Sequence, residues 1–457
     1  MTPVPARSVR VEAPPSKSLS HRKIVAASLA AGETCLSRVL ESDDITRTIA
    51  VLQSVGAGIE RTAPGAYTVT GLSGFPRGGR ETPVSCFMGE SGTSCRLLTA
   101  ILAAGQGMFS IHGTPRLQER PMADLLHILA SLGADIRCMG RPGCLPITLA
   151  ASNLVQPAGT WLPVRADQSS QFLSGLLLAG PLTPGGLRLA LAGERVASWP
   201  YVGLTLQTLE DSGCSVSVTT LEDGLWREAD WRAMDTALPG ATRFAVRPGG
   251  YTPLTGLAAT IEGDYSGASY LLAAGALGPN PVTVGNLRRD SQQGDRAILD
   301  ILESMGASVI WDGTAVTVSP GPLRGITRDM RHCPDLVPTV AVLASMAEGP
   351  TTLEGVGNLR IKESDRLAAP GAELSKIGTK ILVAEDAMTI LPSTERPEHI
   401  ISFSVHNDHR MAMSLALLEL AGLSLTLDDP ACVRKSFPSF WTVWRAIHPG
   451  TRCTGNI

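Results

Sequence analysis

The feature that most constrains the fold is a segment that recurs five times along this 457-residue chain. In each copy, apolar residues at helical spacing end at a glycine, and two short runs of alternating apolar and polar residues follow. A glycine is expected there because it adopts, without strain, the left-handed conformation that commonly ends a helix. The five glycines lie 77, 80, 93 and 72 residues apart and are Gly56, Gly133, Gly213, Gly306 and Gly378.

A second element alternates with the first and occurs six times. It is a short helix of small residues with a polar start, followed by a glycine-rich turn and a strand. Its Ala, Gly and Ser residues favour close packing on all sides. A helix start also presents unpaired N–H groups and the positive end of the helix dipole, which attract anions. The six helices begin near Ser20, Ser91, Ser169, Ser266, Val337 and His409.

The two elements together predict six copies of an α/β unit of roughly 70–80 residues, in two domains of three units each. The strand–turn–strand endings predict mixed sheets rather than a purely parallel sheet. The Pro/Gly-rich stretch RPGGYTP, residues 247–253, lies between the third and fourth copies and is the best candidate for a domain boundary. We therefore predict one domain over residues 15–246 and a second over residues 1–14 and 247–457.

Composition excludes several classes of function. The formal net charge is −3 and aromatic residues make up 4% of the chain, which argues against a dedicated nucleic-acid binder. Apolar runs fall short of the ~20 residues that span a bilayer, so we expect no membrane partner. The N-terminal segment lacks the apolar stretch of a signal peptide, and nine scattered cysteines indicate reduced thiols, so we expect a cytoplasmic protein. Neither the cysteines nor the eight histidines have metal-site spacing, so we expect no metal.

Basic residues gather at the polar helix starts and beside glycines. In PSKSLSHR, GESGTSCR, NLRIKESDR and NDHRMAM, a helix start or turn carries at least one Arg or Lys. Each one alone is more often a solvated surface charge. If they converge, however, their ligands must carry several negative charges, as phosphorylated or carboxylated small molecules do. The set is Lys17, Arg22, Arg96, Arg120, Lys362, Arg366, Arg410 and Lys435.

Two acids lie among these cations. Asp335 precedes the fifth small-residue helix in HCPDLVP, and Glu363 directly follows Lys362. Neighbouring cations stabilise an ionised carboxylate, which suits a base or a hydrogen-bond acceptor. Glu363 could still carry a proton in a dry site with substrate carboxylates nearby. The alternative for both acids is a purely structural ion pair.

Ten ordered segments between residues 15 and 441 give the chain a specific resemblance. They are PSKSLSHR, GESGTSCRLL, GTPRLQERPM, SSQFLSGLL, ASWPYVGLTL, GDYSGASYLLAAGAL, CPDLVPTVAVLA, NLRIKESDRL, NDHRMAMSLAL and RKSFPSFW. The chain thus resembles the enolpyruvyl transferase family, in the branch that acts on shikimate 3-phosphate. The resemblance implies two domains, each of three βαβαββ units, with the active site in the cleft between them. It also implies transfer of the enolpyruvyl group of phosphoenolpyruvate to the 5-hydroxyl of shikimate 3-phosphate by a monomer, with no metal or organic cofactor.

The resemblance also assigns residues to the two substrates and to proton transfer. For shikimate 3-phosphate it implies Lys17, Ser18, Arg22, Ser169, Ser170, Gln171, Ser198, Tyr201, Asp335, Asn358 and Lys362. For phosphoenolpyruvate it implies Lys17, Gly92, Arg120, Gln171, Arg366, Arg410 and Lys435. Asp335 is then the candidate base for the 5-hydroxyl, Glu363 the candidate proton donor to the methylene carbon, and Lys17 a group that shares proton transfer.

The chain departs from the family pattern at three positions. Glu90 stands where the family often has Asn, Trp199 where it often has Lys, and Leu97 where it often has Pro. We expect Glu90 to weaken phosphoenolpyruvate binding unless it pairs with a nearby Arg. Gly92 matches the position that governs glyphosate access in the family, so we expect a glyphosate-sensitive enzyme.

Two alternatives remain. One is the sister activity that transfers enolpyruvate to UDP-N-acetylglucosamine. Its usual N-terminal motif has Lys-Asn where this chain has Lys17-Ser18, and it uses a loop cysteine that we do not recognise here. The other is a non-catalytic, anion-binding relative. Such a protein would have lost Lys17 and the acids Asp335 and Glu363, all of which this chain has.

Overall fold

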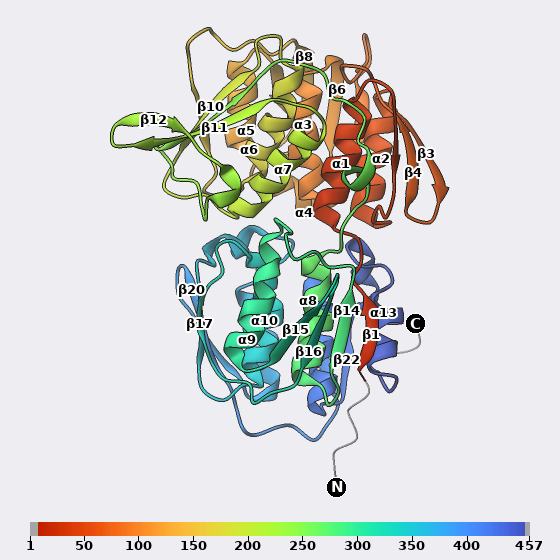
Figure 1. Cartoon of the computed structure of the whole chain (residues 1–457), viewed down its shortest axis with the longest axis vertical. Helices are drawn as coiled ribbons and strands as arrows, with labels where there is room; N and C mark the ends of the chain where they lie inside the picture. The colour runs from red at the N-terminus through yellow and green to blue at the C-terminus, as the bar shows by residue number, and fades with distance from the viewer. Residues whose placement is uncertain (1–7, 453–457) are drawn as a thin grey trace. The chain divides into compact units, whose positions relative to one another are not determined.

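The computed structural model describes residues 8–452 and separates into two compact units (Figure 1). The first unit is Lys17–Ile261, and the second unit joins Met1–Ser16 to Glu262–Ile457. Each unit has its own cluster of buried apolar side chains. The α/β fold class predicted from the sequence is confirmed.

The first unit alternates helices with short strands. After α2, α5 and α7 the chain forms two strands in succession, as the recurring segment predicts. Its elements are α1 (Lys17–Leu29), β2 (Glu33–Leu36), α2 (Asp43–Ser54), β3 (Gly58–Ala63), β4 (Ala66–Thr70), β5 (Val84–Phe87), α3 (Gly92–Ala103), β6 (Gln106–His112), α4 (Pro115–Gln118), α5 (Ala123–Ser131), β7 (Asp135–Cys138), β8 (Ile147–Ser152), β9 (Leu162–Arg165), α6 (Gln171–Ala179), β10 (Leu187–Ala192), α7 (Trp199–Asp211), β11 (Val216–Glu222), β12 (Leu225–Glu228) and β13 (Thr242–Val246).

The second unit begins with an N-terminal strand and continues after the first unit is complete. Two of its α-helices, α9 and α10, directly follow short 3-10 helices, labelled η here. Its main elements are β1 (Val9–Glu12), α8 (Tyr265–Leu277), β14 (Val282–Gly285), η4 (Gly294–Ala297), α9 (Ile298–Met305), β15 (Ser308–Asp312), β16 (Ala315–Ser319), β17 (Thr327–Asp329), η5 (Pro334–Leu336), α10 (Val337–Ser345), β18 (Thr351–Glu354), η6 (Gly357–Ile361), α11 (Ala368–Leu374), β19 (Lys380–Val383), β20 (Ala387–Leu391), β21 (Ile401–Phe403), α12 (His409–Ala416), β22 (Leu425–Leu427), η9 (Pro430–Lys435) and α13 (Phe440–Ile447).

Within residues 8–452 the strands form six sheets, three in each unit. Four sheets share one pattern, a parallel pair followed by antiparallel pairs: β5-β6-β8-β7, β9-β10-β13-β11-β12, β1-β14-β16-β15 and β17-β18-β20-β19. The sheets β2-β4-β3 and β21-β22 are smaller. Mixed sheets are therefore confirmed. Six complete βαβαββ units stay a prediction, because two sheets lack strands of the shared pattern.

The segment predicted as the domain boundary is hydrogen-bonded to the first unit, and its Tyr251 is buried there. The hydroxyl of Tyr251 donates to the carbonyl of Leu178 at 2.6 Å. Ser37 then exchanges backbone hydrogen bonds of 3.0 Å with Ala259 and Ile261, which extends the edge of the sheet at β2. These bonds hold residues 247–261 to the first unit. The compact units consequently divide at 16/17 and 261/262, rather than at the predicted 14/15 and 246/247.

The five predicted helix-ending glycines all have left-handed backbones. Their φ angles lie between 71° and 111°, and the strands β3, β7, β11, β15 and β19 follow them. Gly306 is itself the last cap of α9, at φ 107°. A side chain at these positions would strain the backbone, so each glycine ends a helix and releases the chain into a strand.

The six predicted small-residue helices are α1, α3 and α6 in the first unit and α8, α10 and α12 in the second, and they are largely buried. In the first unit, α1, α3, α6 and α7 pack together (Figure 1). The approach of α3 to α6 is so close that a Cβ on Gly175 would lie 2.7 Å from the backbone oxygen of Arg96. Small residues are therefore a geometric requirement of this contact. No helix in residues 8–452 is long and apolar enough to cross a membrane.

Candidate active site

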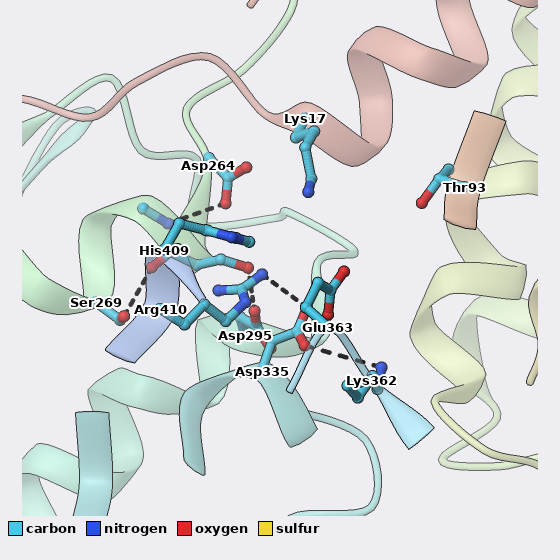
Figure 2. A network of polar contacts seen from close by, with 12 residues as sticks. Lys17, Thr93, Asp264, Ser269, Asp295, Asp335, Lys362, Glu363, His409 and Arg410 are labelled. Carbon is cyan, nitrogen blue, oxygen red and sulfur yellow. Dashed lines mark hydrogen bonds and ion pairs between the residues drawn. The ribbon is translucent and has the colours of Figure 1, made fainter. Parts of the chain in front are cut away.

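In the second unit, Asp335 lies among three basic side chains (Figure 2). It is in η5, directly before α10, and its two oxygens point to different partners. Oδ2 accepts from Arg410 at 2.7 Å, and Oδ1 accepts from Arg366 at 2.9 Å. Lys362 Nζ is 3.9 Å from the same Oδ1. The structure thus brings together four of the predicted site residues from η5, α12 and the segment after η6.

Arg366 is the centre of a buried carboxylate cluster. Its Nε and Nη2 donate to the two oxygens of Asp408 at 2.7 and 3.1 Å, a bidentate pair. Its Nη2 is also 3.0 Å from Glu363 Oε2. Asp408 caps α12, because its Oδ1 accepts from the backbone N–H of Arg410 at 2.9 Å. The cap therefore fixes both the start of α12 and the orientation of Arg366.

The charges of this cluster determine the ionisation of its members. Burial pushes the pKa of Asp335 upward, but the positive charges of Arg410, Lys362 and Arg366 outweigh burial and hold that pKa below its usual range. Burial alone would lower the pKa of Arg366, yet Asp408, Glu363 and Asp335 raise it. Asp335 is thus a carboxylate and Arg366 a cation over the range in which proteins work.

Three other predicted residues lie in the same unit. Asn358 is in η6, and its Oδ1 is buried without a hydrogen-bond partner among the described residues. Lys435 is the last residue of η9 and is buried. Glu363 is mostly buried, with its side chain 15% exposed beside Arg366. A buried acceptor that lacks a protein partner, as in Asn358, is a place where a ligand donor can bind.

In the first unit, Lys17 is the first residue of α1 and pairs with Asp44. The Lys17 Nζ lies 3.2 Å from Asp44 Oδ2, near the start of α2. Both side chains are largely buried, at 15% and 7% exposed. The pairing holds the Lys17 ammonium in one place.

Arg22 is buried one turn further along α1 and is held by neutral oxygens. Its Nε donates to Thr205 Oγ1 at 2.8 Å, and its guanidinium also donates to the carbonyls of Tyr201 and Ser18 at 2.9 and 3.0 Å. Burial lowers the pKa of Arg22 to about 10. The group is still charged at neutral pH, and its neutral acceptors leave that charge available to an anionic ligand.

The starts of α3 and α6 meet through the predicted polar residues. Gln171 accepts from Arg96 Nη1 at 2.8 Å and donates to Thr93 Oγ1 at 3.0 Å. Ser169 Oγ accepts from the backbone N–H of Gln171 at 3.2 Å, and Ser170 directly precedes α6. Arg96 thus links two helix starts, which places several donors around them.

Gly92 is the first residue of α3, and the guanidinium of Arg120 lies against it. A Cβ at Gly92 would be 2.7 Å from Arg120 Nη1 and 2.8 Å from its Cζ. Arg120 is itself buried. Any side chain at Gly92 must therefore displace Arg120, which couples the two residues that the resemblance assigns to phosphoenolpyruvate.

Ser198 and Tyr201 lie at the start of α7. Ser198 has a left-handed backbone, φ 59° and ψ 55°, although it is not a glycine. Such strain at a non-glycine residue persists only where the surrounding structure holds it and is common at functional sites. The neighbouring Trp199 is buried and donates to the carbonyl of Met234 at 3.0 Å. Trp199, at one of the positions where we expect a departure from the family pattern, is therefore a core residue in this chain.

The sequence analysis did not identify two carboxylates that belong to the site. Asp44 and Asp408 complete the contacts of Lys17 and Arg366. Each stands at or beside the first turn of a helix, which is the signal that could have identified them. At the starts of α8 and α12, a carboxylate of this chain already accepts from one backbone N–H. Asp264 accepts from Gly267 N, and Asp408 accepts from Arg410 N.

The sequence profile described as EPSP synthase (3-phosphoshikimate 1-carboxyvinyltransferase) matches residues 3–225 and 232–444, nearly the whole chain. The chain belongs to the EPSP synthase family. It is 38% identical over 434 residues to a 3-phosphoshikimate 1-carboxyvinyltransferase of Shewanella amazonensis, with 94% of each chain covered. It is 35% identical to that of Cellvibrio japonicus, with 96% of each covered.

Solved structures give the same family. An EPSP synthase from Acinetobacter baumannii matches with a TM-score of 0.72 and 25% identity, and the match covers 96% of this chain and 95% of that one. The enolpyruvyl transferase NikO from Streptomyces tendae shares the fold, with a TM-score of 0.69 at 18% identity. The resemblance to the enolpyruvyl transferase family is thereby confirmed, and the EPSP synthase family is its branch.

Proposed function

We propose that this chain transfers the enolpyruvyl group of phosphoenolpyruvate to the 5-hydroxyl of shikimate 3-phosphate, giving 5-enolpyruvylshikimate 3-phosphate and phosphate. The observation that carries the proposal is the near full-length match to the EPSP synthase family, with relatives named for this activity at 38% and 35% identity. The reaction belongs to the shikimate pathway of aromatic amino-acid biosynthesis.

The proposed chemistry is an addition followed by an elimination. A proton adds to the methylene carbon of phosphoenolpyruvate, and the 5-hydroxyl oxygen bonds to its central carbon while losing its proton to a base. The tetrahedral intermediate then loses phosphate, and the new methyl group returns one proton to restore the methylene. One C–O bond forms, the C–O bond to phosphate breaks and the protons balance, with no oxidation or reduction, so we propose that no metal or organic cofactor takes part. Fixed positive charges stabilise the anionic intermediate.

Within this scheme we propose that Asp335 is the base and that Glu363 supplies the proton to carbon, with Lys17 sharing in proton transfer. Asp335 is held ionised by Arg410, Lys362 and Arg366, which supports the role of proton acceptor over that of proton donor. The contact of Glu363 with Arg366 at 3.0 Å places it in the same cluster. The same acid and base serve in both halves of the reaction, since elimination reverses the proton movements.

We propose that both units supply ligands for the substrates. The first unit provides Lys17, Ser18, Arg22, Gly92, Arg120, Ser169, Ser170, Gln171, Ser198 and Tyr201, and the second Asp335, Asn358, Lys362, Arg366, Arg410 and Lys435. The buried charge of Arg22 and the unpartnered acceptor of Asn358 support their roles. Nε, Nη1 and Nη2 of Arg366 already have carboxylate partners. Its proposed contact with phosphoenolpyruvate therefore requires the guanidinium to bind the substrate and these carboxylates at the same time.

Three further properties complete the proposal. We propose a monomer in the cytoplasm that is inhibited by glyphosate. The eight cysteines among the described residues are all unpaired, which supports a reducing compartment. Gly92, with Arg120 against it, supports sensitivity. Micromolar inhibition competitive with phosphoenolpyruvate is the expected result, and full activity in millimolar glyphosate would contradict it. Sedimentation of the purified chain tests the monomer.

A phosphate-release assay tests the central proposal. With shikimate 3-phosphate and phosphoenolpyruvate together, the chain should release phosphate at a steady rate, and either substrate alone should give none. Replacing shikimate 3-phosphate by UDP-N-acetylglucosamine should abolish release. Release only with the nucleotide sugar would establish the sister activity, and no release with either acceptor would establish a non-catalytic, anion-binding relative.

A further inference from the structure

Asp295 is a buried acid for which the proposed chemistry has no role. It lies in η4, before α9, and is 2% exposed. One of its oxygens, Oδ2, accepts from the hydroxyl of Ser266 on α8. The other, Oδ1, is buried and has no hydrogen-bond partner among the described residues. A buried carboxylate with only one neutral donor is poorly stabilised, so this environment favours the protonated acid.

The neighbours of Asp295 reinforce the neutral form. Figure 2 shows Asp295 beside Asp335 and Arg410. Burial and the negative charge of Asp335 raise the pKa of Asp295 to about 7, and the opposing effect of Arg410 is smaller. The titratable groups that interact with it are Asp264 before α8, Cys333 and Asp335 at η5, and Arg410 at the start of α12.

Arg410 connects the two acids. Its Nη2 donates to Asp335 at 2.7 Å, and Asp335 is ionised through three cations. A neutral Asp295 leaves the charge of Arg410 shared between Asp335 and any anionic ligand. An ionised Asp295 adds a second negative charge within reach of Arg410 and would compete with that ligand.

We propose that Asp295 is a positioning residue that acts as a neutral carboxylic acid, keeping Arg410 oriented by Asp335 and available to an anionic substrate. When Asp295 loses its proton, binding of phosphoenolpyruvate weakens. The inference rests on the proposed function, because Arg410 is assigned there to phosphoenolpyruvate. It assigns Asp295 no contact with substrate; the residue acts through Arg410 and Asp335.

The test is the KM for phosphoenolpyruvate from pH 5.5 to 8.5, measured by phosphate release. In the unmodified enzyme, KM should rise about 3- to 10-fold above pH 7. Asp295→Asn imitates the neutral acid, so it should keep kcat within about threefold and lose the rise in KM. Titration of the substrate itself affects both proteins equally. The ratio of the KM of the unmodified enzyme to that of Asp295→Asn at each pH therefore reports on Asp295 alone. The matched control is Asp300→Asn on the following helix, whose side chain is 67% exposed. It should retain the unmodified profile.

Two outcomes overturn the inference: an Asp295→Asn enzyme that keeps the rise in KM, or one that folds but is inactive at every pH. Infrared spectroscopy gives a readout independent of activity and of the variant's folding. The unmodified protein should show the C=O band of a protonated carboxyl at pH 6 that disappears near pH 7, and absence of this band also overturns the inference. If the unmodified protein releases no phosphate but shows the band, the proposed function fails while the neutral state of Asp295 stands.

Discussion

Arg22 in the first unit and Arg366 in the second are both buried, but their charges have different partners. Arg22 is surrounded by neutral acceptors, and burial lowers its pKa to about 10. Arg366 is surrounded by Asp408, Glu363 and Asp335, and its pKa is raised. A buried charge matched by carboxylates organises structure, whereas one held by neutral oxygens keeps a positive potential for a ligand. Arg22 is thus the stronger candidate for direct substrate binding, and Arg366 for orienting Asp335.

Lys17→Met should lower kcat by a factor of at least about 10² while the chain stays folded, because the variant loses a charged group that shares in proton transfer. The carboxylate of Asp44 then loses its ammonium partner at 3.2 Å, so the free energy of unfolding should fall by about 1–3 kcal/mol. Steady-state phosphate release and thermal unfolding check the two effects. Lys380→Met, at an exposed position in β19, is the control and should change neither. Near-normal turnover of Lys17→Met would refute its catalytic role.

Gly92→Ala should raise the KM for phosphoenolpyruvate about tenfold or more and leave that for shikimate 3-phosphate within about twofold. The added Cβ would lie 2.7 Å from Arg120 Nη1, and the loss of one hydrogen bond to a charged group costs about 1.5–3 kcal/mol. Initial-rate kinetics with each substrate varied measure both constants. Gly185→Ala has nothing within 4 Å and should leave both constants unchanged. If the KM values for phosphoenolpyruvate and shikimate 3-phosphate rose equally, displacement of Arg120 would not be the cause of the change.

Among the elements, small-residue helices allow helix starts to come together. Gly175 lets α6 approach α3, and the same approach lets Arg96 bridge the starts of these helices through Gln171. The packing and the polar cluster are therefore two results of one helix contact. Substituting Gly175 affects both.

Gly175→Ala should destabilise the first unit by about 1–3 kcal/mol, since its Cβ would meet a backbone oxygen at 2.7 Å and the backbone must shift. For a unit of this size that lowers Tm by roughly 2–4 °C for each kcal/mol. Scanning calorimetry measures the change. Gly371→Ala in α11 is a matched control, because its nearest neighbour would be 3.9 Å away. Its Tm should stay equal or rise, as Ala favours a helix. A stable Gly175→Ala protein would show that the helices can separate without cost.

The Asp335 cluster should make stability depend on acid pH. A carboxyl whose pKa is depressed by folding adds stability above its unfolded pKa, about 3.9, and this contribution is lost as pH falls through the folded pKa. The Tm advantage of the unmodified chain over Asp335→Asn should therefore be constant from pH 7 to about pH 5 and shrink below about pH 4. Calorimetry across this range tests it. An advantage that stays constant to pH 3 would contradict an ionised, paired Asp335.

Much of the fold could be predicted because helix ends and apolar periodicity are local signals. The five glycines predicted five helix ends, and all five have left-handed backbones. The basic residues of the site were also found, since they stand beside glycines and helix starts. Asp44, Asp295 and Asp408 were not, because they contact Lys17, Ser266 and Arg366, which lie 27, 29 and 42 residues away in the chain. The edge contribution of residues 259–261 to the sheet at β2 was missed for the same reason.

At the scale of the whole molecule, both units are expected to act on the same ligand. Without shikimate 3-phosphate, so that no turnover occurs, phosphoenolpyruvate at about 100 times its Kd should stabilise the protein by about 2.7 kcal/mol. Arg120→Gln in the first unit and Arg410→Gln in the second should each lose most of that increment but keep the increment from shikimate 3-phosphate. Calorimetry with each ligand compares every variant with its own ligand-free form. If one variant keeps the full phosphoenolpyruvate increment, its unit does not hold this substrate.

The strand β1 is synthesised long before the strand with which it pairs. Its residue Val9 pairs in parallel with Val282 of β14, although the whole first unit lies between them in the sequence. At about 5–20 residues per second, the ribosome takes roughly 14–55 s to reach β14 after β1 has emerged. The first unit can fold during that interval, while β1 waits without its partner strand. Newly made second units should therefore mature last, and a chaperone that shields a lone strand would act on this N-terminal segment.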